Sequence, residues 1–176
     1  SALQPNTLYA GVIIVTDSGG LSTTNNVGFD TFDAAQAFVF EAEDYNYANG
    51  QYLEDRGINM YAGALGTQGV DCYDTTLTSF GIYRSDEVDV AATPDVVRAK
   101  FVTPAVDYQI GTIGLGEWWN YTATLANSPY NLWVRYSSTA TVPQDIRVDR
   151  VTSDRTLPNQ TLEFLGVVKA PQTGNL

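Results

Sequence analysis

The sequence predicts an all-β protein. The chain contains 15 glycines and 11 tyrosines, and its apolar residues occur in short strand-like runs. No amphipathic helical pattern continues beyond about two turns. Tyrosine favours strands and glycine favours turns, and many short strands separated by turn signals are typical of sandwiches and barrels.

Charge and composition exclude several classes of function. The chain has 20 acidic and 9 basic residues, a formal net charge of −11, so nucleic acid is not an expected partner. No run of about 18 apolar residues occurs, and we therefore expect no membrane-spanning helix. Two explanations of the acidity remain open, a solvated surface and carboxylates that hold calcium.

The residue inventory also argues against an enzyme. The chain has one cysteine, Cys72, which leaves no internal disulfide, and it has no histidine. The commonest general base, Ser–His and Cys–His nucleophile pairs and most zinc sites are thereby excluded. Hydrolysis by two carboxylates would not need histidine, but no base–nucleophile pair or cleft motif occurs. We therefore expect no catalytic activity.

The first predicted element is a β-hairpin. A Val/Ile-rich strand at 10–16 is followed by a turn at 17–20 and an extended piece at 27–32. The order L-x-P-x-T-x-Y ending at Tyr9, then D-x-G-G and F-D-T-F, resembles the last two strands of a fibronectin type III or related immunoglobulin-like domain. We expect residues 1–33 to be the end of such a domain; a short independent hairpin is the alternative.

A strand is next predicted at Phe38–Tyr45, after a short linker at 33–36. In an extended strand, Glu41 and Glu43 project from the same side. Side chains at i and i+2 lie about 7 Å apart, close enough to share one hard cation. A polar strand face explains the same spacing, so this pattern alone leaves both interpretations open.

The stretch richest in aromatic residues predicts a central β-hairpin. Residues 116–125 and 130–136 contain many aromatic and β-branched residues, and a Pro-containing turn separates them. The turn pairs Leu125 with Tyr130. One face would then be apolar and line the core, with Trp119, Tyr121, Ala123, Leu125, Tyr130, Leu132, Val134 and Tyr136 on it.

The opposite face of this predicted hairpin carries two tryptophans where water is expected. In the register set by the turn, Trp118 faces Ser137, Asn120 faces Arg135, and Thr122 faces Trp133. Weaker alternating patterns predict further strands, and a Gly-, Asn- and Tyr-rich stretch at 45–74 predicts long loops separated by short strands. The further strands are 83–90, 96–102, 146–151 and 161–168.

Several of these stretches resemble, in their order, one known family. They are Glu41-Ala42-Glu43-Asp44, the G-x-x-G-V-D of 66–71, Tyr83-Arg84, Gly116-Glu117-Trp118-Trp119-Asn120-Tyr121, and the arginine-containing stretch 130–136. The succession covers residues 37–176 and resembles the family 6 carbohydrate-binding modules of secreted bacterial polysaccharide-degrading enzymes. The most specific motifs are E-A-E-D and G-E-W-x-N-Y.

The resemblance implies a jelly-roll β-sandwich without catalytic activity, and a structural Ca²⁺ bound by Glu41 and Glu43. The family takes a further acidic ligand from its final strand, which the sequence stops short of at Leu176. We therefore expect residues 37–176 to lack the last strands of the jelly roll.

The resemblance also implies binding of a polysaccharide or oligosaccharide. Thr112 stands where the family commonly has an aromatic residue of its loop-end sugar cleft, so a site on the sheet face is the better expectation. Aromatic rings stack on sugar C–H surfaces, and Asn and Arg hydrogen-bond hydroxyls. The predicted contacts are Trp118, Trp133, Asn120 and Arg135. The alternative is that a loop or the N-terminal hairpin covers these tryptophans.

Two function hypotheses follow. The first is a non-catalytic carbohydrate-binding module of a larger secreted or cell-surface protein, extracellular and bacterial. The second is a structural or adhesive domain of an extracellular surface or filamentous assembly. In that case neighbouring domains or identical chains would complete the open sheet edges by strand exchange.

Overall fold

The structure is a computed structural model that describes residues 2–5, 7–31, 38–53, 59–75, 81–93 and 106–174. These residues form strands, turns and irregular segments without a helix, which confirms the all-β class. In this part of the chain, no helix has the length and apolar character needed to cross a membrane. The predicted strand at 96–102 lies outside the described residues. The chain divides into two compact units, Ser1–Val39 and Phe40–Leu176.

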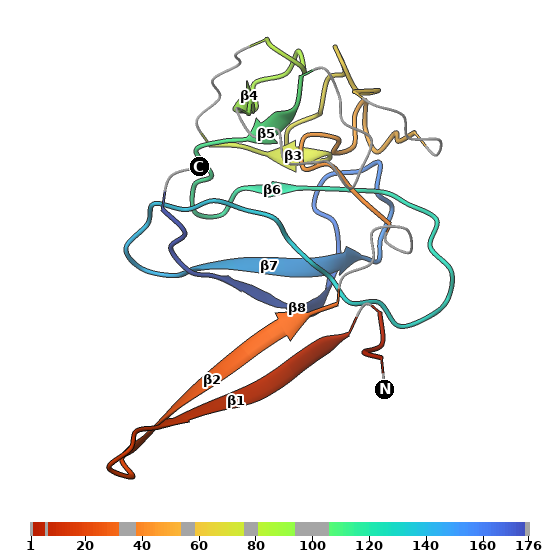
Figure 1. Cartoon of the computed structure of the whole chain (residues 1–176). Helices are drawn as coiled ribbons and strands as arrows, with labels where there is room; N and C mark the ends of the chain where they lie inside the picture. Colours follow the sequence, from red (N-terminus) through yellow and green to blue (C-terminus); the bar gives the residue numbers. More distant parts are fainter. Residues whose placement is uncertain are drawn as a thin grey trace. The chain divides into compact units, whose positions relative to one another are not determined.

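The first unit contains a long antiparallel hairpin of β1 (Leu8–Thr16) and β2 (Ser22–Asp30) (Figure 1). Asp17 closes its turn, because its carboxylate accepts the N–H groups of Gly19 at 2.8 Å and Leu21 at 2.9 Å. Tyr9 and Phe29 stack at the other end with their ring centroids 5.5 Å apart. The predicted hairpin is therefore confirmed, and its assignment to an immunoglobulin-like domain stays a prediction.

The described residues of the second unit form three antiparallel strand pairs (Figure 1). β4 and β5 lie between β3 and β6 in sequence, so these two pairs are nested, and β7–β8 follows them. The strands predicted at 146–151 and 161–168 are confirmed as β7 and β8. The pairs are β3 (Cys72–Tyr73) with β6 (Trp118–Trp119), β4 (Val90–Ala92) with β5 (Tyr108–Ile110), and β7 (Gln144–Val151) with β8 (Leu162–Ala170).

The predicted central hairpin is wrong. Trp118 pairs with Tyr73 in β3, and the residues from 120 to 143, all of them described, form no strand. Asn120 donates its backbone N–H to the Asp71 carbonyl at 2.8 Å, and its own carbonyl accepts the N–H of Asn46 at 2.8 Å. The backbone N–H and carbonyl of Asn120 are thus hydrogen-bonded to segments distant in sequence. The stretch 130–136 does not pair with them.

The core also differs from the prediction. Side chains that the hairpin would have buried are exposed, among them Tyr121 at 37%, Leu125 at 44%, Tyr130 at 55%, Leu132 at 57% and Val134 at 36%. The buried cluster comes instead from the stretch predicted as loops and from the segment that follows it. Its members are Tyr45, Tyr61, Cys72, Tyr83, Val88 and Val90, with Trp119 packed against them.

Candidate functional site

Three carboxylates gather in the second unit. Glu41, Glu43 and Asp107 each offer a ligand oxygen, and these oxygens lie within 4.8 Å of one another. Glu43 is 2% exposed and Asp107 is 9% exposed. The two glutamates were predicted from the sequence, whereas Asp107 was missed because it lies far along the chain, next to β5.

The local structure around the glutamates is not the predicted strand. The chain turns at Ala42 and Glu43, where the Asp44 N–H donates to the Glu41 carbonyl at 3.1 Å. The two carboxylates therefore do not lie at alternate positions of an extended strand. Their closeness comes from this turn.

Tyr83 connects the segment of Asp107 to this turn through one hydrogen bond and one ring stack. The hydroxyl of Tyr83 donates to Asp44 Oδ1 at 2.6 Å. The Tyr83 ring stacks on Tyr108 at 4.5 Å between centroids, with an interplanar angle of 14°. Asp44 follows Glu43 and Tyr108 follows Asp107, so the stacked pair links the two ends of the acidic cluster. Burial, the hydrogen bond to Asp44 and the charge of Glu43 all raise the pKa of Tyr83.

The donor set fits a hard divalent cation. Carboxylate oxygens are the preferred ligands of Ca²⁺ and Mg²⁺, and Ca²⁺ takes about six to eight oxygens in a flexible geometry. Three carboxylates supply up to six oxygens. The three carboxylates suit either Ca²⁺ or Mg²⁺.

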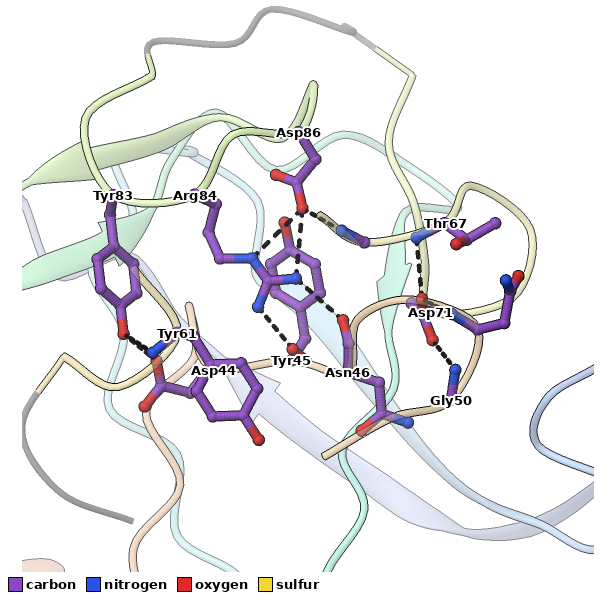
Figure 2. Close-up of polar contacts among 12 residues, drawn as sticks. Asp44, Tyr45, Asn46, Gly50, Tyr61, Thr67, Asp71, Tyr83, Arg84 and Asp86 are labelled. Atoms are coloured by element: carbon purple, nitrogen blue, oxygen red, sulfur yellow. Dashed lines mark hydrogen bonds and ion pairs between the residues drawn. The ribbon is translucent and has the colours of Figure 1, made fainter. Parts of the chain in front are cut away.

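A buried arginine organises the residues beside this cluster (Figure 2). The Arg84 side chain is fully buried and lies 3.3 Å from Asp86 Oδ2. Its guanidinium donates to the carbonyls of Tyr45 at 2.7 Å and Asn46 at 3.0 Å, and it stacks over the Tyr45 ring at 3.8 Å. It therefore holds the segment that follows the Glu41–Asp44 turn.

Asp71 holds the neighbouring loops together through hydrogen bonds to their backbone (Figure 2). Its side chain is buried, and its carboxylate accepts the N–H groups of Asn49 at 3.0 Å, Gly50 at 2.6 Å and Thr67 at 2.9 Å. Asn49 and Gly50 have φ values of +63° and +80°, a conformation that Asn and Gly tolerate best. The G-x-x-G-V-D motif thus contributes to folding through its aspartate.

The four predicted sugar contacts do not lie together on one face of a hairpin, as the sequence predicted. Trp118 lies in β6 and is half-buried. Asn120 is half-buried, and its Nδ2 donates to the Val70 carbonyl and to Gln160 Oε1, both at 2.7 Å. Trp133 is 38% exposed and Arg135 is exposed, and both lie outside any strand. Asn120 therefore has a structural role in joining distant loops.

The chain has no match among protein-family models, curated proteins or solved structures.

Cys72 should react with thiol reagents only after unfolding. Its side chain is 0% exposed. Burial, aided by the charge of Asp86, raises the pKa of the thiol to about 12. Because the thiolate is the nucleophile, we expect negligible maleimide labelling of the folded protein at pH 7.5. One label per chain should appear in denaturant, measured by intact mass. Fast labelling of the folded protein would contradict this burial.

Proposed function

We propose that this protein is a non-catalytic carbohydrate-binding module of a larger extracellular protein, of the family 6 type. The observation that carries the proposal is the acidic cluster. The resemblance assigns Glu41 and Glu43 to a structural cation, and the structure gathers both with a third carboxylate, Asp107. This agreement supports the resemblance, from which sugar binding follows.

The proposed architecture is a jelly roll. The nested pairing of β3–β6 around β4–β5 supports it, because a jelly roll is built from antiparallel strands in Greek-key order. The β7–β8 pair fits the wall of such a sandwich. Ile146, Val148, Val168 and Ala170 share its more buried face, while Arg147, Asp149 and Phe164 lie on the other.

The acidic cluster is proposed to hold Ca²⁺ for stability. A cation that binds only the folded state stabilises by RT ln(1 + [L]/Kd), about 2.7 kcal/mol at a hundredfold excess over Kd. EDTA should therefore lower the melting temperature by several degrees, and added Ca²⁺ should restore it. Scanning calorimetry with elemental analysis of the metal content measures both.

Matched variants test whether the Ca²⁺-dependent melting temperature comes from the acidic cluster. Glu43→Gln and Asp107→Asn should each abolish the response to Ca²⁺. Glu163→Gln should keep it, because that carboxylate lies on β8, where it pairs with Arg150 at the surface. An unchanged melting curve after complete metal removal would remove the proposed site.

Sugar binding is tested directly on the wild-type protein. We expect retention on at least one insoluble or immobilised polysaccharide, and signals on a glycan array that soluble sugar competes away. Heat-denatured protein and bovine serum albumin serve as controls. Absence of binding across a broad array of plant, algal and microbial glycans would reject the proposal.

A second candidate is a domain of an extracellular structural assembly. The observation favouring it is the β1–β2 hairpin, a two-stranded sheet whose apolar residues are exposed on both faces. Val12 and Ile14 alternate with Ile13 and Val15, and all four are 50–64% exposed. Strand exchange between copies would predict a dimer or larger species by light scattering, whereas a monomer at high concentration argues against it.

A further inference from the structure

The β3–β6 pair presents two aromatic side chains on one face. Tyr73 lies directly opposite Trp118, and Cys72 lies opposite Trp119. Side chains directly opposite in an antiparallel pair project to the same face, with Cβ atoms about 4.5–5.5 Å apart. Cys72 is buried in the core and Trp119 packs against it. Tyr73 and Trp118 therefore project away from the core.

The two rings are accessible on a fixed backbone. Tyr73 is 45% exposed and Trp118 is half-buried. The strand pair beneath them continues directly from Asp71, whose carbonyl accepts the Asn120 N–H and whose carboxylate binds three further backbone N–H groups. Rings held on such a support lose little conformational freedom when a ligand stacks on them.

Acidic residues flank this pair in the sequence. Glu117 precedes Trp118, and its carboxylate accepts the Gly114 N–H at 2.5 Å. It also accepts the N–H of Thr75 at 3.0 Å and its hydroxyl at 2.6 Å. Asp74 follows Tyr73 and is 3% exposed, and the whole chain has a net charge of −11. A ligand with carboxylate or sulfate groups would meet like charge here.

We propose that Tyr73 and Trp118 form a stacking platform for the C–H face of a pyranose ring, in a glycan that carries no acidic groups. This inference rests on the carbohydrate-binding function proposed above, and it specifies the binding face and the chemical class of the sugar. It replaces the predicted surface between Trp118 and Trp133, because the partner of Trp118 across the strands is Tyr73.

The test compares point variants of the full chain. Affinity electrophoresis would use xylan, mixed-linkage β-glucan and galactomannan as neutral probes, with polygalacturonate and alginate as acidic probes. The wild type should bind a neutral probe and neither acidic one. Tyr73→Ala should weaken that binding about tenfold or more, a loss of about 1.4 kcal/mol, with an unchanged melting temperature because the ring is exposed. Tyr73→Phe should retain it.

Trp133→Ala is the matched control, because Trp133 is an exposed aromatic residue outside the strand pair. It should leave the affinity unchanged. If Trp133→Ala abolishes binding and Tyr73→Ala does not, the platform is overturned while the carbohydrate-binding function stands. Preferential binding of polygalacturonate or alginate overturns the proposed sugar class. If the wild type binds no glycan on the broad array, the proposed function itself fails, and this inference fails with it.

Discussion

Replacing Arg84 with methionine should lower the free energy of unfolding by about 3–5 kcal/mol, because one partner of a buried ion pair is removed. Methionine has a similar length but no donors. The Asp86 side chain, 6% exposed, would lose its cation. The carbonyls of Tyr45 and Asn46 would lose their donors, and the Tyr45 ring would lose its stacking partner. Urea denaturation followed by tryptophan fluorescence measures the change.

Arg147→Met is the control for this variant. Arg147 pairs with Asp149 at 2.8 Å, but its side chain is 63% exposed, so its removal should cost much less stability than the removal of Arg84. Arg84→Lys should be intermediate, because lysine keeps the charge but cannot reach Asp86 and two carbonyls with one planar fork. Equal stability of Arg84→Met and the wild type would show that this network does not stabilise the fold.

Asp71→Ala should destabilise by a similar amount, about 3–5 kcal/mol. The substitution leaves three backbone N–H groups without their acceptor, that of Gly50 buried and those of Asn49 and Thr67 part-buried. An unsatisfied buried donor costs about 1–3 kcal/mol. The loop at Asn49 and Gly50 loses the contact that holds its left-handed backbone. Thermal unfolding measures the stability, and amide hydrogen exchange at Gly50 and Thr67 reports the local loss.

Asp154→Ala is the control for this variant, because it removes an aspartate that accepts hydrogen bonds within a turn at the surface. Asp154 accepts the N–H of Thr156 at 2.9 Å and its hydroxyl at 2.7 Å, but these bonds are exposed. We expect Asp154→Ala to lose much less stability than Asp71→Ala. If the two aspartate variants lose the same stability, burial of the Asp71 bonds is not the cause.

The β1–β2 hairpin and the individual strands β7 and β8 could be predicted from the sequence because their signals are local. In β1–β2 an Asp-containing turn separates two extended runs, and the strands on either side pair in simple register. In β7 apolar and charged residues alternate along the strand. A period of two and a turn signal suffice when the partner is the next strand in the chain.

The short strands could not be predicted in the same way. β3 and β6 have two residues each, too few for an alternating pattern, and they pair across a long separation in sequence. The aromatic stretch 116–136 has the composition of a hairpin, but strand propensity depends on the surroundings that tertiary packing supplies. Here Trp118 and Trp119 pair with β3 instead, because Trp119 packs in the core beside Cys72 and the Asp71 carbonyl accepts the N–H of the next residue, Asn120.

The candidate cation site was also predicted only in part. The sequence by itself determined the all-β class, the β1–β2 hairpin, the strands β7 and β8 and the pair of glutamates, because each depends on neighbours in the chain. Only the tertiary structure decided that Asp107 joins Glu41 and Glu43, and that Tyr73 lies opposite Trp118. The reason is physical: these contacts arise where Tyr83 stacks on Tyr108 and where Cys72 enters the core. The energy of such packing depends on residues far apart in sequence, which no local pattern records.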